Sequence, residues 1–225
     1  MKKRIIQILL ALSLIFYKST WFRWIFNHFA ARFVPASREY FLLLAFLELS
    51  VTLLTVLYLL VFEGKKMLEL KWKWKWRYPV YLLLAYGVNY LSDSVFSFLT
   101  PATSNQIALN ELIEMTGRQE LLYFLILTCL LGPIAEEMVY RGVLMNTFLK
   151  DSPWYGDVLL SACTFGYVHV SSGLTPLAFF TYASGGAILA LLYRKTHSLY
   201  YPILLHFMVN ITAFWYLWIN LFSAS

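Results

Sequence analysis

The chain alternates long apolar runs with short polar segments. Each run approaches about 20 residues, the length at which a helix crosses the hydrocarbon core of a bilayer. The pattern predicts seven membrane-spanning helices, at residues 5–28, 40–62, 79–99, 120–149, 156–172, 174–193 and 199–220. The predicted fold class is therefore all-α, a polytopic transmembrane helix bundle.

The first of these runs is the least regular. Its strongly apolar part, from Ile5 to Tyr17, is short, and Lys18, Arg23 and His28 follow it. A basic start followed by an apolar run is also typical of a signal peptide. We find no convincing cleavage site near Lys18, so we expect this segment to be an uncleaved membrane anchor.

Composition supports a membrane protein and excludes other classes. Hydrophobic residues make up 60% of the 225 residues and charged residues 13%, whereas ordinary soluble domains have about 45–50% and about 25%. A soluble domain of this size could not bury so many large apolar side chains. Disordered chains, collagen-like repeats and disulfide scaffolds are excluded by the same numbers.

Lysine and arginine residues are distributed unevenly between the loops. With the N-terminus inside and the C-terminus outside, the inner segments contain Lys2, Lys3, Arg4, Lys65, Lys66, Lys71, Lys73, Lys75, Arg77, Lys150, Arg194 and Lys195. The outer segments contain only Arg32, Arg38 and Arg118. Because cytoplasmic loops carry an excess of Lys and Arg, the pattern predicts an N-in, C-out orientation.

One inner loop interleaves tryptophan with basic residues, from Lys71 to Arg77. Such a pattern can indicate nucleic-acid binding. At a membrane edge, the same residues place indole rings at the headgroup level and basic groups on anionic phosphates. We therefore expect this loop to contact anionic lipids of the bilayer, and we expect no nucleic-acid partner.

The fourth predicted span has the densest group of ionisable residues within apolar sequence. Ionisable side chains are costly in hydrocarbon, so each is a candidate functional residue. Glu137 and Arg141 are four residues apart and can neutralise each other on a helix. Glu136 has no such partner and is free for chemistry. Pro133, just before the two acids, should kink or restart the helix.

Two further spans contribute polar residues with helical spacing. Phe165 and His169 share one face of the fifth span, so the phenyl ring could hold the imidazole in place. His206 and Asn210 share one face of the seventh span. With a rise of 1.5 Å per residue, Glu136 and His169 lie roughly 20 Å from the inner ends of their helices, and His206 and Asn210 roughly 10 and 16 Å. These depths allow one shared cavity.

These residues resemble the motifs of the CPBP family of CAAX-protease and bacteriocin-processing intramembrane proteases, also called Abi proteins. The EExxxR motif matches Glu136, Glu137 and Arg141. The FxxxH motif matches Phe165 and His169. The HxxxN motif matches His206 and Asn210. Each motif alone is weak, but three in order on separate spans are specific.

The resemblance implies hydrolysis of a peptide bond within the membrane. By this resemblance Glu136, assisted by His169, activates a water molecule, and His206 and Asn210 stabilise the oxyanion. Glu137, Arg141 and Phe165 would support the site. The family favours a mechanism without a metal cofactor, and Asn210 is a poor zinc ligand. A zinc site formed by Glu136, His169 and His206 remains the alternative.

The resemblance divides the chain into two parts. Residues 1–119 would form N-terminal spans and the basic Trp/Lys loop, and residues 120–225 a catalytic transmembrane core. The expected partner is a membrane peptide or protein substrate, and the expected location is a cell membrane, most simply a bacterial plasma membrane. Two other functions are considered: a transporter or proton relay, supported by Glu48 and Asp93 in other spans, and a non-catalytic scaffold or immunity protein.

Overall fold

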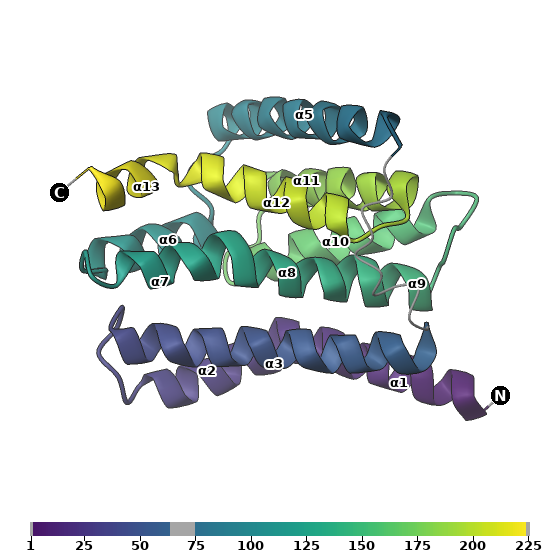
Figure 1. Cartoon of the computed structure of the whole chain (residues 1–225), viewed down its shortest axis with the longest axis horizontal. Helices are drawn as coiled ribbons and strands as arrows, with labels where there is room; N and C mark the ends of the chain where they lie inside the picture. Colours follow the sequence, from purple (N-terminus) through teal and green to yellow (C-terminus); the bar gives the residue numbers. More distant parts are fainter. Residues whose placement is uncertain (1, 64–74, 224–225) are drawn as a thin grey trace.

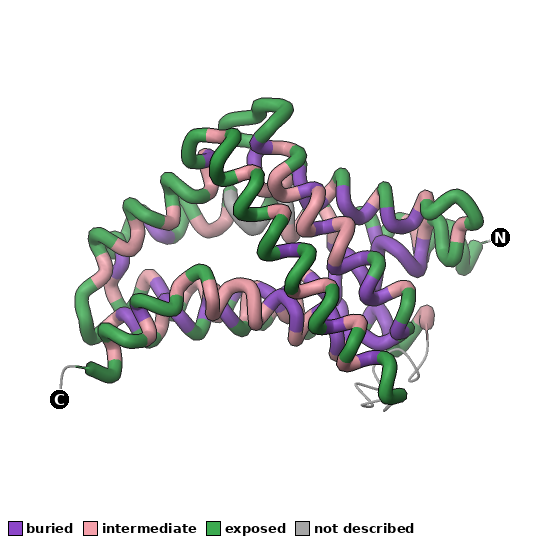
Figure 2. The backbone as a smooth tube through the Cα atoms, turned by 90° about the horizontal axis from the view of Figure 1, so that it is seen from above, coloured by how far each residue is buried: buried purple, intermediate pink, exposed green. Residues whose placement is uncertain are grey.

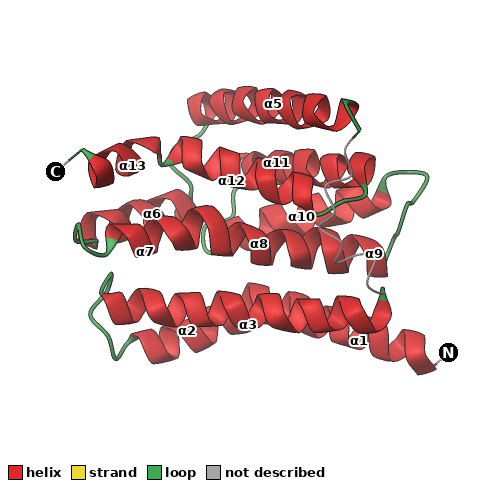
Figure 3. Ribbon diagram, in the orientation of Figure 1, coloured by secondary structure: helices red, strands yellow, loops and turns green. Residues whose placement is uncertain are grey.

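The computed structural model describes residues 2–63 and 75–223, and these residues form helices joined by loops, with no strand among them (Figure 3). The predicted all-α fold class is confirmed. The helices are α1 (Lys2–Phe16), η1 (Tyr17–Trp21), α2 (Phe22–Ala30), α3 (Arg38–Phe62), α5 (Arg77–Leu99), α6 (Ser104–Met115), α7 (Leu121–Ile126), η2 (Leu127–Leu131), α8 (Gly132–Glu137), η3 (Met138–Leu144), α9 (Met145–Thr147), α10 (Gly156–Val170), α11 (Pro176–Thr196), α12 (Tyr200–Ala213) and α13 (Trp215–Phe222).

Four of the described helices are long and apolar enough to cross a membrane by themselves: α3, α5, the helix Leu121–Thr147 and α11. The pair α12 and α13 would be a fifth if it forms one span, although the two are bent by 68°. The predicted spans at 5–28 and 156–172 are also helical, but η1 interrupts the first and α10 has only 15 residues. The protein is thus a multi-pass membrane protein, whereas the count of seven spans and the orientation stay predictions.

The long helices lie side by side, and the two termini lie at opposite ends of the bundle (Figure 1). The layer formed by α1, α2 and α3 packs along the helix that runs from α7 to α9, and α5 lies on the far side of α11 and α12. Residues 71–74 of the predicted lipid-binding loop lie outside the described residues.

One helix was not predicted from the sequence. Helix α6 follows α5 and begins with a capping box, in which the Thr103 hydroxyl accepts from the Gln106 backbone N–H and the Gln106 side chain accepts from the Thr103 backbone N–H. Its polar composition hid it from a search for apolar runs. The S/T-x-x-Q spacing at its start is a signal that would have found it.

Exposed residues cover the outer faces of the helices, and buried residues lie where helices meet (Figure 2). Many exposed residues are large and apolar, including Phe46, Leu83 and Phe98. Apolar patches of this extent mark surfaces that contact lipid or another protein. They are the surfaces on which a bilayer would replace water.

Helices α10 and α11 approach closely because small residues line their contact. A Cβ atom on Gly166 would lie 2.9 Å from the Ala183 Cβ and 3.0 Å from the Phe179 carbonyl oxygen. A Cβ atom on Gly186 would lie 3.2 Å from the Phe165 Cβ. Small residues at a helix contact let the two backbones approach closely. This contact places His169 of α10 against α11.

We expect Gly166→Ala to destabilise the protein by about 1–3 kcal/mol, because the added methyl group must separate α10 from α11. The matched control is Gly87→Ala in α5, where nothing lies within 4 Å of the added atom. That control gains helix propensity and should be neutral or slightly stabilising. Thermal unfolding in detergent compares the two, and equal midpoints would contradict the prediction.

Candidate functional site

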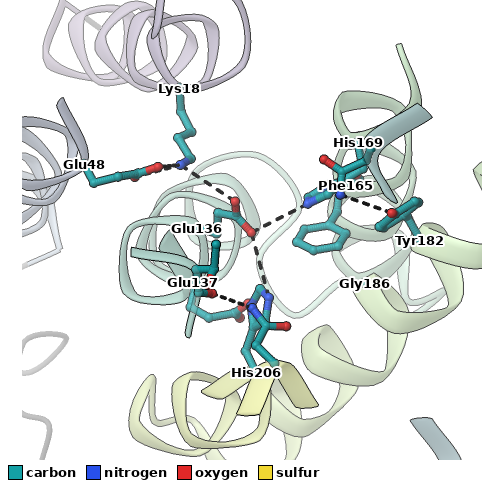
Figure 4. A network of polar contacts seen from close by, with 12 residues as sticks. Lys18, Glu48, Glu136, Glu137, Phe165, His169, Tyr182, Gly186 and His206 are labelled. Atoms are coloured by element: carbon teal, nitrogen blue, oxygen red, sulfur yellow. Dashed lines mark hydrogen bonds and ion pairs between the residues drawn. The ribbon is translucent and has the colours of Figure 1, made fainter. Parts of the chain in front are cut away.

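Three of the predicted site residues meet inside the bundle. The Glu136 Oε2 atom lies 3.9 Å from the His169 Nε2 atom and 4.0 Å from the His206 Nε2 atom (Figure 4). The three side chains come from α8, α10 and α12 and are between 10% and 18% exposed. Both separations exceed a direct hydrogen bond but suit a bridging water. The predicted convergence of these three residues is confirmed.

A fully buried ion pair lies beneath this cluster. Glu137 Oε1 accepts from Arg141 Nη1 at 2.8 Å, and both side chains are 0% exposed. Arg141 Nη2 also donates to the Gly186 carbonyl oxygen at 2.7 Å. The same Glu137 oxygen lies 2.9 Å from the Nδ1 atom of His206. The predicted Glu137–Arg141 pair is confirmed, and it connects the helix Leu121–Thr147 to α11 and α12.

The hydrogen bonds at Nδ1 determine which ring nitrogen of each histidine faces the cluster. His169 Nδ1 lies 2.9 Å from the Phe165 carbonyl oxygen, which can only accept, so Nδ1 carries the hydrogen. His206 Nδ1 lies 2.9 Å from the Glu137 carboxylate oxygen, which also accepts from Arg141. In their neutral forms both rings therefore present an unprotonated Nε2 to Glu136.

The ring of His169 is held between two aromatic side chains. Its centroid lies 4.2 Å from that of Phe165 and 4.8 Å from that of Tyr182, and it stacks on Tyr182 with an interplanar angle of 19°. The predicted support by Phe165 is confirmed, whereas Tyr182 was not identified from the sequence. The Tyr182 hydroxyl contacts Thr103 and Asn105 at the start of α6, so α6 takes part in holding this ring.

Asn210 makes a different contact from the one expected. Its Nδ2 donates to the Thr128 carbonyl oxygen at 2.7 Å. In η2 the Gly132 N–H bonds to the Leu127 carbonyl, five residues back, so the next donor would be Pro133, which has no N–H. Asn210 supplies the donor that proline lacks. The helix therefore continues past Pro133 by way of a π-helical turn, and Asn210 of α12 supplies the missing donor.

No group of three or more His, Cys, Asp or Glu residues in the described part of the chain is arranged to hold a metal ion. In the alternative zinc set, the Glu136 oxygen and the two histidine nitrogens are 3.9–4.0 Å apart. Ligand atoms at about 2.0–2.1 Å from one tetrahedral zinc would be closer to each other. A mechanism without a metal stays a prediction.

The part of the chain that carries the three motifs is similar to known membrane peptidases. Residues 118–212 match the family model described as type II CAAX prenyl endopeptidase Rce1-like. We call residues 118–212 the Rce1-like segment, after the family model that they match. The resemblance to CAAX proteases that the three motifs predicted is confirmed over these residues.

A curated relative gives the same indication. The protein named "Putative membrane peptidase YdiL" from Bacillus subtilis (strain 168) is 30% identical over 86 residues, which is 38% of this chain. The chain spans about a third of the length of that relative, at 34%. No solved structure matches the chain.

Residues outside the Rce1-like segment also reach the cluster. Lys18 Nζ from η1 lies 3.7 Å from Glu136 Oε1, and it donates to both carboxylate oxygens of Glu48 from α3 at 2.6 and 2.7 Å (Figure 4). The prediction that Glu136 lacks a charged partner was therefore wrong. An isolated lysine and an isolated glutamate in two apolar runs were the missed signal, because such charges must pair in the membrane.

Asp93 of α5 makes a contact that is separate from the Glu136 cluster. It accepts from Asn89 Nδ2 at 2.6 Å on its own helix, α5. Glu48 and Asp93 were the residues that supported a transport path. In the structure Glu48 belongs to the Glu136 cluster, so no observation favours transport over hydrolysis.

Replacement of Glu137 should be far more damaging to stability than replacement of its neighbour. Glu137→Gln leaves the buried Arg141 without its counter-ion, which costs about 3–5 kcal/mol. Glu136→Gln is the matched control, because Lys18 keeps Glu48 as its partner and Glu136 is partly exposed. Thermal unfolding of the two purified variants in detergent checks the difference. Similar unfolding midpoints would contradict it.

The contact of Asn210 gives a second stability prediction. Asn210→Ala leaves the Thr128 carbonyl without its donor, which we expect to cost about 1–3 kcal/mol. Pro133→Ala returns an N–H to the helix at the same place, so the double variant should recover part of that loss. A double-mutant cycle of unfolding free energies measures this coupling. Strictly additive effects would show that the two residues act independently.

Proposed function

We propose that the protein is an intramembrane endopeptidase that hydrolyses a peptide bond of a membrane-associated peptide or protein. One observation carries the proposal: a single carboxylate oxygen of Glu136 faces the Nε2 atoms of both His169 and His206 inside an apolar bundle. The Rce1-like segment supports the same reaction class. A positioned carboxylate and an imidazole are groups that enzymes use to activate water.

In the proposed reaction, a water molecule lies between Glu136 and His169 and attacks the substrate carbonyl carbon. One proton of that water passes to the carboxylate of Glu136, while His169 Nε2 accepts a hydrogen bond from the other O–H group. The same proton then passes to the leaving amine as the peptide bond breaks. Support for His169 comes from its bond to the Phe165 carbonyl, which leaves Nε2 as an acceptor.

His206 and Asn210 are the proposed donors to the oxyanion of the tetrahedral intermediate. Because Nδ1 of His206 faces the Glu137 carboxylate, its Nε2 can donate only when the ring is an imidazolium. Asn210 Nδ2 has two hydrogens, and the bond to Thr128 uses one of them, which leaves the other for the oxyanion.

The proposed setting is a cell membrane, most simply a bacterial plasma membrane, with a membrane peptide or protein as substrate. We propose an N-in, C-out orientation, with the Lys71–Arg77 loop on anionic lipids of the inner surface and no nucleic-acid partner. We propose no metal cofactor. The N-terminal part, residues 1–119, would surround and support the catalytic part, residues 120–225.

The test compares membrane peptides from cells that carry wild type and Glu136→Gln, identified by mass spectrometry. We expect peptides with new termini only with wild type, because the variant lacks the base, and loss of a general base costs at least about 100-fold in rate. A substrate found in this way is then cleaved in proteoliposomes, where His169→Ala and His206→Ala should also be inactive.

The controls separate loss of chemistry from loss of folding. Each variant must insert and elute as wild type does in size-exclusion chromatography. Glu111→Gln, on the surface of α6 away from the described cluster, controls for carboxylate removal in general. Full cleavage by Glu136→Gln would refute the proposed function, and solute flux without cleavage would favour a transporter.

A further inference from the structure

The N-terminal helices contribute an ion pair to the cluster around Glu136. Lys18 and Glu48 lie outside residues 118–212, and their side chains are 8% and 11% exposed. Lys18 Nζ makes its two short contacts with the Glu48 carboxylate and a longer one, 3.7 Å, with Glu136 Oε1. Two carboxylates from different helices therefore share one ammonium group.

The two carboxylate oxygens of Glu136 face different partners. Its Oε1 atom faces Lys18, whereas its Oε2 atom faces the two histidines (Figure 4). The ammonium group thus attracts the oxygen that does not face the histidines. A carboxylate held at one oxygen has a defined orientation for the other, which is the atom that must reach a water molecule.

The local backbone supports a functional role for Lys18. It lies in η1, a π-helical turn inside the first helix. The helix Leu121–Thr147 has two similar turns, η2 before Pro133 and η3 with Arg141. Single π-helical turns are rare and frequently occur at functional sites. The only such turn described in the N-terminal part thus coincides with the residue that contacts Glu136.

We propose that Lys18 is a positioning residue of the site, which orients Glu136 through Oε1 while Glu48 holds the ammonium group in place. This inference rests on the proposed function of Glu136. The N-terminal helix would therefore contribute a residue to the active site and would also anchor the protein in the membrane.

The decisive variant is Lys18→Met with Glu48→Leu. Removal of Lys18 alone would leave two buried carboxylates without their cation and would destabilise the fold. Replacement of both members of a buried pair by apolar residues of similar size is often neutral. We expect the double variant to unfold within about 4 °C of wild type, with kcat reduced up to about 100-fold by misplacement of the carboxylate and with KM little changed.

Two further measurements separate positioning from a merely structural role. Lys18→Arg keeps a cation at this position and should retain more of kcat than the apolar double variant. The infrared band of Glu136, isolated as the difference from Glu136→Gln, should move when Lys18 and Glu48 are both replaced. The matched control is Asn89→Leu with Asp93→Leu, a polar pair on α5, which should leave that band in place.

The outcomes are distinguishable from those of the proposed function. Wild-type kcat in the apolar double variant overturns the inference, whatever the infrared band does. An unchanged band overturns it as well. If wild type cleaves no membrane peptide, the proposed function fails, whereas a band that moves still supports the contact between Lys18 and Glu136.

Discussion

The buried ion pair between Glu137 and Arg141 is the contact on which the arrangement of the site depends. Hydrocarbon offers no partner to a charge, so these side chains must satisfy each other inside the bundle. Once paired, Arg141 reaches the Gly186 carbonyl on α11, and Glu137 reaches His206 on α12. One ion pair thus sets the relative positions of three helices. The neighbouring Glu136 is carried on the same helix and turns towards a different side, where it meets the histidines.

Irregular helix geometry supplies the second constraint. The helix Leu121–Thr147 contains the turns η2 and η3, and Pro133 lies between them. The carbonyl that Pro133 leaves without a donor is bonded by Asn210, so a local defect in one helix becomes a contact with another. The N-terminal helix also has a π-helical turn, η1, and this turn contains Lys18. Regular helices would satisfy their own backbone groups and would make fewer such connections.

The sequence predicted the parts of this site that depend on local spacing. Glu137 and Arg141 pair because four residues bring side chains to one face of a helix, and the same spacing places Phe165 beneath His169. The motif match identified the histidines, and residues 118–212 match the Rce1-like family model. Lys18, Tyr182 and the partner of Asn210 were not predicted, because each contact joins residues more than 10 positions apart and no local spacing encodes it. Helix α6 was missed because it is polar.

The sequence by itself therefore determined the class of molecule, the helices that are apolar over their full length and the residue types available for chemistry. These follow from composition and periodicity, which act over one or two helical turns. Only the tertiary structure decided which charges share a partner, which oxygen of Glu136 faces the histidines and which nitrogen each histidine presents. Those outcomes depend on the packing of small residues such as Gly166 and Gly186, which sets how closely helices approach. They also depend on the requirement that every buried charge finds its partner in three dimensions.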